Sequence, residues 1–312
     1  MNTSRRDFLK TGSAALAAGL ASKSSLWSAA HAHGFSAKRP IGYSLYGMAS
    51  LPVLDAIDAR ARIGYDNFEV CVMDGFPTQL DKFTRDTQIA VRDRARKHGL
   101  DISSILFHGT IVKENEQKKV CENIKKAGEI SHVLNEKNPP LLESVMGGSK
   151  PLWDTGKQMI VDRIGAWAEA AASIGVKVAV KAHAGSAVHR SDQLLWVYRQ
   201  VNHPNLALTY DYSHYKAEGF EMEPTMRDVV PHASFIHVKD VALWPPVRFL
   251  YAGEGTIDWV RYFELIRELK YTGPICVEVS GHIHKLSKYE PIQPAELCYQ
   301  ALSRARDKAY SV

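Results

Sequence analysis

From residue 41 onward, short apolar runs alternate with longer stretches whose apolar residues recur every three or four positions. The longer stretches have the period of amphipathic helices, and the short runs have the length of buried strands. Two helical stretches are clearest, with apolar faces at Ile160, Ile164, Trp167, Ala171 and Ile174, and at Val260, Phe263, Ile266 and Leu269. Eight strands are predicted, at Ile41–Met48, Asn67–Val72, Ile102–His108, Leu141–Met146, Lys177–His183, Leu206–Asp211, Ser234–Asp240 and Ile275–Ser280.

Glycines mark several boundaries of this alternation. Gly64, Gly99, Gly175 and Gly273 each stand between a helical stretch and the next strand. Glycine ends helices readily because it adopts the left-handed conformation without steric cost. Repeated strand–helix units give a parallel sheet, and eight of them predict closure into a single-domain (β/α)8 TIM barrel. An open doubly wound sheet is the alternative, although no G-x-G-x-x-G sequence follows the first strand.

The first 32 residues have the order of segments of an export signal. The pair Arg5-Arg6 is followed by Phe8 and Leu9, then by a stretch rich in Ala and Gly, and then by a small-residue site that ends at Ala32. This order is typical of a twin-arginine signal peptide. We therefore expect residues 1–32 to be a signal recognised by the twin-arginine (Tat) translocase. Residues 33–312 would then form the mature barrel, in the periplasm.

The mature part is expected to carry little net charge. The proposed signal holds four cations and one acid, so its removal lowers the formal net charge from +5 to about +2. A near-neutral surface argues against nucleic acid as the main partner, and no later stretch has the long apolar character of a membrane span. The cysteines show no C-x-x-C spacing, and two of them lie in strand-like runs as core residues. They are Cys71, Cys121, Cys276 and Cys298.

Ionisable residues share one face of the last four strands. Side chains alternate between the two faces of a strand, and here the bulky aliphatic residues take the other face. Glu69 stands in the same relation to its apolar neighbours on the second strand. We expect this ionisable face to point into the barrel near its C-terminal end, where barrel enzymes hold their active sites. Its members are Lys181, His183, Asp211, His237, Lys239 and Glu278.

An inward Asp, His and Glu from three neighbouring strands could bind a divalent cation. Asp211, His237 and Glu278 would supply carboxylate oxygens and an imidazole nitrogen. This mixture suits Mn²⁺, Co²⁺, Zn²⁺ or Fe²⁺ better than Ca²⁺. The alternative is a buried hydrogen-bonded network without a metal, but the convergence of three strands with one parity favours the metal site.

Four short motifs in the C-terminal half occur in a fixed order. They are Asp211-Tyr212-Ser213-His214, His237-Val238-Lys239-Asp240, Gly253-Glu254-Gly255-Thr256-Ile257-Asp258 and Val277-Glu278-Val279. In this order and spacing the chain resembles the sugar phosphate isomerase/epimerase family, whose members are xylose-isomerase-like TIM barrels. The resemblance is strongest from about Gly175 to Val279, and the strand count extends it over the mature chain.

The resemblance implies a divalent metal held by a Glu, an Asp, a His and a Glu from the last four strands. On this basis Asp211, His237 and Glu278 would be metal ligands, His214 would bind substrate, and Lys239 and Asp240 would lie at the rim. The chain departs from the pattern at one position, because Lys181 stands where the first Glu is expected. Either three residues hold the metal, or His183 or Glu143 substitutes, or no metal binds.

Two roles are open for Lys181. As a structural cation it would replace the charge of the metal and pair with Asp211 or Glu278. As a catalytic group beside a bound cation it would have its pKa lowered toward neutrality, and it could accept a proton next to a substrate carbonyl. We expect the second role because three candidate ligands converge beside it, and we take Lys181 and Glu278 as the candidate catalytic residues.

Further polar residues are candidate substrate contacts. His108 ends the third predicted strand, His183 ends the fifth, and Arg248 lies in the loop after the seventh. With His214, Lys239 and Glu69 they are expected to bind the substrate. A loop-capping role is the alternative for His108, and a solvated position is the alternative for Arg248.

These features together predict a metal-assisted isomerase or epimerase of a small sugar or keto-sugar, which abstracts a proton next to a carbonyl. A lyase or dehydratase would use the same step and then expel a β-leaving group. A non-catalytic carbohydrate-binding barrel, in which Lys181 has replaced the metal, is the third reading. An abasic-site endonuclease is disfavoured, because it would need a richer metal cluster and a basic face for DNA. Oligomeric state and substrate identity do not follow from these patterns.

Overall fold

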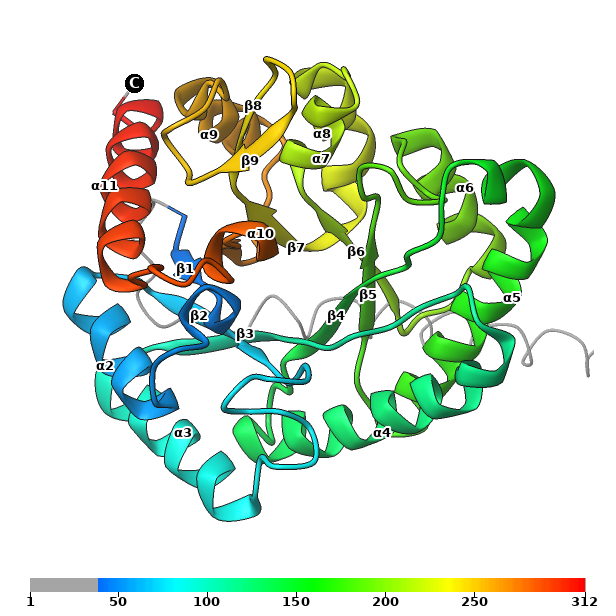
Figure 1. Ribbon diagram of the computed structural model, residues 1–312, viewed down its shortest axis with the longest axis horizontal. Helices are drawn as coiled ribbons and strands as arrows, with labels where there is room; N and C mark the ends of the chain where they lie inside the picture. The colour runs from blue at the N-terminus through cyan, green and yellow to red at the C-terminus, as the bar shows by residue number, and fades with distance from the viewer. Residues whose placement is uncertain (1–38, 312) are drawn as a thin grey trace, which may run out of the picture. The chain divides into compact units, whose positions relative to one another are not determined.

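All eight predicted strands occur in the computed structural model, which describes residues 39–311. They pair in parallel and close in the order β1-β10-β7-β6-β5-β4-β3-β2, with helices around the outside (Figure 1). The single TIM barrel is therefore confirmed, whereas the predicted signal, residues 1–32, lies outside the described residues. The barrel strands are β1 Ile41–Tyr43, β2 Asn67–Cys71, β3 Asp101–Leu106, β4 Leu141–Val145, β5 Val178–Lys181, β6 Leu206–Tyr210, β7 Ala233–Val238 and β10 Ile275–Val277.

The helices follow the strands and cover the barrel. The main ones are α2 Val53–Ile63, α3 Arg85–His98, α4 Gln117–Leu134, α5 Pro151–Ala172, α6 Ser191–Val201, α9 Trp259–Glu268 and α11 Ile292–Ala309. Shorter ones are α7 Tyr212–Ala217, α8 Met222–Val229, α10 Gly281–His284 and the 3-10 helices η1 Leu45–Met48, η2 Glu114–Glu116 and η3 Val230–His232. The last helix, α11, packs against both α9 and α2, which closes the helical ring (Figure 1).

Inside the barrel, one face of the strands forms two successive layers. The first layer is a buried apolar cluster separate from the main core, and we call it the apolar layer: Leu141, Ala179, Ala207, Phe235 and Cys276. Two positions further along β4, β5, β7 and β10, the same face carries Glu143, Lys181, His237 and Glu278. With Asp211 after β6 and Lys239 after β7, we call these the charged layer. The parity predicted for the ionisable residues matches this arrangement.

Two local expectations are corrected. The first strand ends at Tyr43, and η1 follows it because the Ser44 hydroxyl accepts a hydrogen bond from the Tyr46 backbone N–H at 3.1 Å. Gly64, Gly99 and Gly175 have the expected left-handed backbone, but at the end of α9 the left-handed residue is Lys270, with φ 53°. Gly273 is instead required by space, since a Cβ there would lie 2.3 Å from the Tyr271 hydroxyl.

An antiparallel hairpin that was not predicted follows β7. It consists of β8 Asp240–Ala242 and β9 Arg248–Leu250. Asp240, expected at the rim, is fully buried and holds the next loop in place. Its carboxylate accepts hydrogen bonds from the backbone N–H groups of Gly253 and Ile257 and from the Trp259 indole. The motif that begins at Gly253 is therefore a loop folded around one buried carboxylate.

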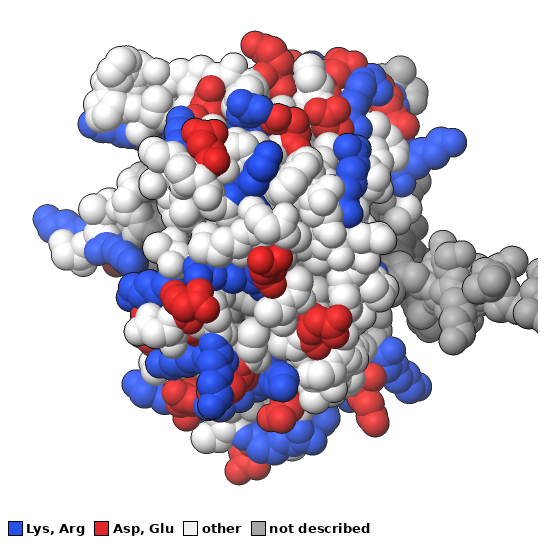
Figure 2. Space-filling model, turned by 90° about the vertical axis from the view of Figure 1, so that its right-hand side faces the viewer, with Lys and Arg blue, Asp and Glu red and all other residues white. Residues whose placement is uncertain are grey.

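Other sequence expectations concern the surface and the cysteines. Lys and Arg side chains are interspersed with Asp and Glu over the face shown in Figure 2, rather than gathered in one basic patch. Among residues 39–311, no helix combines the length and apolar character that crossing a bilayer requires. All four cysteines are free, and Cys71, Cys276 and Cys298 are buried as core residues.

Candidate functional site

The ammonium group of Lys181 lies at the centre of the charged layer. It donates to His237 Nδ1 at 2.8 Å and to Glu278 Oε2 at 3.2 Å. Two more carboxylates lie close by, with Glu143 Oε1 at 3.4 Å and Asp211 Oδ2 at 4.0 Å from Nζ. The side chain is 1% exposed. Lys181 thus contacts residues from four other strands or strand ends.

The electrostatic surroundings keep Lys181 protonated. Burial alone would lower its pKa, but the carboxylates of Glu143 and Glu278 outweigh this and raise the pKa above its usual value. This direction is opposite to the one expected beside a bound cation. At 2.8 Å, Lys181 Nζ and His237 Nδ1 can share only one hydrogen, so Nδ1 accepts and the imidazole holds its proton on Nε2.

Lys239 is a second buried cation in this layer, not a residue of the rim. Its Nζ donates to Asp211 Oδ2, to Glu278 Oε2 at 2.6 Å and to His214 Nε2 at 3.1 Å. The side chain is 3% exposed and lies over the ring of Phe249 from the hairpin, 5.4 Å from its centroid. Asp211 is fixed from its other side by the Ser213 hydroxyl, which donates to Oδ1 at 2.6 Å.

Glu278 joins the two lysines and is the most accessible carboxylate of the charged layer. Its Oε2 accepts hydrogen bonds from both ammonium groups, and its side chain is 12% exposed. Burial raises its pKa, but Lys181 and Lys239 lower it more, so the pKa lies well below its usual value. Glu278 is therefore ionised at neutral pH.

Two further carboxylates lie deeper and are fully buried. Glu69 accepts from the hydroxyls of Ser44 at 2.7 Å and Ser104 at 2.9 Å, and His237 Nε2 lies 3.2 Å from its Oε1. In this position Glu69 orients His237 rather than contacting a substrate, which differs from its expected role. The sequence did not determine which face of its strand Glu143 occupies, and the structure shows that it points inward. Burial raises the pKa of its carboxyl group. Neither of its oxygens has a hydrogen-bond partner among the described residues.

Two closely packed imidazoles lie beside the charged layer. The rings of His183 and His214 lie 3.9 Å apart, and Phe249 packs edge-on against His214 at 4.9 Å. Burial and the two lysines lower the pKa of His183 to about 4. Burial, together with Lys239, also lowers the pKa of His214. Both rings are neutral at pH 7, and His183 is partly exposed toward solvent.

The remaining predicted contacts do not join this cluster. His108 follows β3 and is exposed, with no contact to the charged layer in the hydrogen bonds and ion pairs of the described residues. Arg248 is exposed at the start of β9 and pairs in register with Ala242. Both stay predictions as substrate contacts.

An aromatic group that the sequence interpretation missed lies near Glu278. The ring of Tyr46 stacks on Phe76 at 5.4 Å and meets His284 edge-on at 4.3 Å. Burial and Glu278 raise the pKa of Tyr46 to about 12, so its hydroxyl is neutral. The three residues follow β1, β2 and β10, and their place just after strand ends is the signal that could have identified them.

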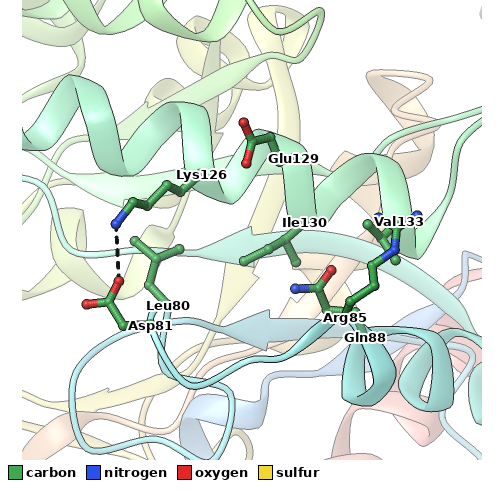
Figure 3. A pocket seen from close by; sticks show the side chains of 8 residues that line it. All are labelled: Leu80, Asp81, Arg85, Gln88, Lys126, Glu129, Ile130 and Val133. Carbon is green, nitrogen blue, oxygen red and sulfur yellow. Dashed lines mark hydrogen bonds and ion pairs between the residues drawn. The ribbon is translucent and has the colours of Figure 1, made fainter.

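A separate groove lies in the outer helical layer between α3 and α4 (Figure 3). It has a volume of about 390 Å³, an apolar floor that includes Leu80, Ile130 and Val133, and an ion pair of 3.2 Å between Lys126 and Asp81. No predicted site residue lines it. The groove is therefore separate from the charged layer.

Two groups of donor atoms could hold a metal. Asp211, His237 and Glu278 each offer one ligand atom within 4.8 Å of the others, and Glu69, Glu143 and His237 form a second such group. A divalent ion would need these atoms at about 2.0–2.2 Å. In the first group each donor already accepts from a lysine ammonium. In the second, Glu69 is held by two serines and Lys181 lies beside Glu143. As the side chains stand, the first group does not fit a divalent ion, whereas the second retains the unpartnered oxygens of Glu143.

Comparisons with known proteins agree with this architecture. A curated relative, inosose isomerase of Bacillus licheniformis, is 23% identical over 242 residues, which cover 75% of this chain and 86% of the relative. The crystal structure of the IOLI protein with a bound zinc atom superposes with a TM-score of 0.71 at 18% identity, over 88% of this chain and 100% of that one.

A second solved structure, 3-keto-D-glucoside 4-epimerase from E. coli, superposes with a TM-score of 0.67 at 16% identity, over 86% of this chain and 99% of that one. At these identities the structural matches establish the fold. The family model described as "Xylose isomerase-like TIM barrel" matches residues 57–302. This match spans most of the chain, and the protein belongs to the xylose isomerase-like TIM barrel family.

Proposed function

We propose that the protein is an isomerase or epimerase of a small keto-sugar, and that it moves a proton next to the substrate carbonyl. One observation carries this proposal: Glu278, an ionised and partly exposed carboxylate, lies between the ammonium groups of Lys181 and Lys239. Proton abstraction next to a carbonyl needs a base and a positive group for the oxygen that gains charge. This arrangement supplies both within hydrogen-bond distance of each other.

In the proposed reaction the carbonyl oxygen accepts hydrogen bonds from the lysines and Glu278 takes the proton. The C–H bond breaks, its electron pair forms the C=C bond of an enediolate, and the oxygen charge is held by ammonium groups. While the substrate oxygen occupies the lysines, Glu278 loses their hydrogen bonds and becomes more basic. Return of the proton to the former carbonyl carbon, with the neighbouring hydroxyl proton passing to the former carbonyl oxygen, gives isomerisation. Delivery of a solvent proton to the opposite face of the same carbon gives epimerisation.

The relatives narrow the substrate class. The curated relative is named for an inosose, and a solved relative is named for a 3-keto-D-glucoside. Both names describe a ring with hydroxyl groups and one carbonyl. In this chain Tyr46 offers an aromatic ring, and the neutral His183 and Tyr46 offer polar edges. Such a mixture of aromatic surface and few polar groups suits a small hydroxylated ring.

The experiment is product analysis by NMR with a panel of inososes, 3-keto-glycosides and free ketohexoses. We expect a positional isomer or an epimer from one class, and loss of this activity in Glu278→Gln. An unsaturated product would show that the chain is a lyase, which uses the same first step. Absence of any conversion, together with saturable binding of the same sugars, would favour the non-catalytic carbohydrate-binding barrel.

We also propose that the twin-arginine pathway exports the protein, on the sequence of residues 1–32 alone. The variant Arg5→Lys with Arg6→Lys should leave the precursor inside a host that has this pathway, because the paired arginines are the recognition element. Lys23→Arg in the same segment is the control and should be exported. Recovery of the double variant from the periplasm would contradict the proposal.

A further inference from the structure

Lys181 Nζ occupies the middle of the donor group that could hold a metal. Asp211, His237 and Glu278 have ligand atoms within 4.8 Å of one another. Nζ lies 2.8 Å from the His237 atom, 3.2 Å from the Glu278 atom and 4.0 Å from the Asp211 atom. Metal–ligand distances are only about 2.0–2.2 Å, so an ion bound by these three atoms would overlap the position of the ammonium nitrogen.

We propose that the Lys181 ammonium replaces the divalent ion at this site, so that the protein carries its positive charge in Lys181 and Lys239 and works without a bound metal. A solved structure of the same fold holds zinc, and this chain has a lysine at the centre of its own donor group. The substitution exchanges a removable cation for a covalently attached one.

The surroundings of Lys181 are built for an ammonium group. An ammonium has three N–H donors, and Nζ faces an imidazole nitrogen and carboxylates of Glu278 and Glu143. The side chain is 1% exposed, so the ammonium group is shielded from bulk solvent. Neither oxygen of Glu143 has a hydrogen-bond partner among the described residues, so Lys181 is its nearest compensating charge.

Lys239 supplies a second ammonium group to the same donor atoms. It donates to Asp211 and to Glu278, which are the two carboxylates of the donor group. All three candidate ligand residues are thus bonded to a lysine nitrogen before any ligand arrives. What the lysines do in the reaction rests on the proposed function, but their displacement of a metal does not.

Metal binding to the purified protein tests this inference without a substrate. The probes are Mn²⁺, Co²⁺, Zn²⁺ and Mg²⁺, each added alone, with isothermal titration and elemental analysis after dialysis. We expect the wild type to bind none of them stoichiometrically. Lys181→Glu removes the ammonium and adds a carboxylate to Asp211, His237 and Glu278, so it should bind about one Mn²⁺ or Zn²⁺ per chain.

Two controls keep the result interpretable. Lys125→Glu makes the same charge change on the exposed face of α4 and should bind no more metal than the wild type. Lys181→Met is close in size, should fold even if Lys181→Glu does not, and should bind Mn²⁺ weakly through three ligands. Circular dichroism checks the fold of each variant.

Stoichiometric metal in the wild type would overturn the inference, and so would a folded Lys181→Met that binds nothing. A wild type that binds no metal beside a Lys181→Glu variant that does would support it. If no keto-sugar is converted, the proposed function fails, while the metal measurements still decide the role of Lys181.

Discussion

The apolar layer and the charged layer lie on the same face of the same strands, two residues apart, and serve different ends. In β7, Phe235 belongs to the apolar cluster and His237 to the charged one. In β10, Cys276 and Glu278 are related in the same way. Because side chains alternate along a strand, residues two positions apart point to the same side, and both layers face the barrel interior. The difference teaches that the apolar layer contributes to the stability of the barrel, while the charged layer is arranged for chemistry rather than stability.

Glu278→Gln should have the largest effect on turnover, because it removes the proposed base from the charged layer. It keeps the shape of the side chain but removes the base, so turnover of the keto-sugar should fall by about 10²- to 10⁴-fold, the usual scale for general-base catalysis. Steady-state kinetics on the purified variant provide the measurement. Glu129→Gln, on the exposed face of α4, is the control. A variant that retains the full rate would remove Glu278 from the mechanism.

Phe235→Ala should instead remove packing from the apolar layer and lower the stability of the protein. Phe235 is fully buried in that layer, and such truncations lower the free energy of unfolding by about 3–5 kcal/mol. Denaturant unfolding measures the loss. Phe220→Ala, at a side chain that is 36% exposed, should cost much less. Equal losses at the two positions would contradict the layer model.

Acid should lower the free energy of unfolding through the histidines beside the charged layer. The pKa of His183 is about 4 in the folded protein, against 6.5 for an ordinary histidine. The unfolded chain therefore takes up protons first, so stability is complete above pH 6.5 and falls until pH 4. This linkage amounts to about 2 kcal/mol between pH 7 and pH 5, and His214 acts in the same direction. Denaturant unfolding at pH 7 and pH 5 measures this difference in the free energy of unfolding. If His183→Gln shows the same difference, this imidazole is not its source.

Ser104→Ala should have only a small effect on turnover and tests the support beneath the charged layer. The Ser104 hydroxyl donates to Glu69, which in turn orients His237. Loss of one hydrogen bond to a charged group should lower the free energy of unfolding by about 1.5–3 kcal/mol at most, and a small loss of turnover should accompany it. The neighbour Ser103 donates to the Phe68 carbonyl outside this chain of contacts. Ser103→Ala should therefore leave turnover unchanged.

The fold could be predicted from the sequence because the alternation is regular. Each strand has the length and apolar content of a buried parallel strand, and the helical period returns between the strands. The hairpin of β8 and β9 was missed because its two strands are three residues each. The buried role of Asp240 was missed because it depends on backbone N–H groups from a loop more than ten residues further on.

Within the site, strand parity identified which residues converge, but not how deeply each one lies. Lys239 shares the face of His237, yet the resemblance placed it at the rim. Glu143 could not be assigned a face, because a parallel strand in a barrel is apolar on both sides. The contact between Lys181 and His237 joins residues 56 positions apart, and the strand order that places β5 and β7 on either side of β6 brings them together.

The central claim is that Glu278 moves a proton next to a substrate carbonyl, and hydrogen exchange in D₂O tests it most directly. Because the Glu278 side chain is partly exposed, a proton that it holds should exchange with solvent before it returns. We predict that the wild type introduces deuterium at the carbon next to the carbonyl of its keto-sugar, and that Glu278→Gln does not. Conversion without deuterium entry, or exchange by Glu278→Gln at the wild-type rate, would contradict the claim.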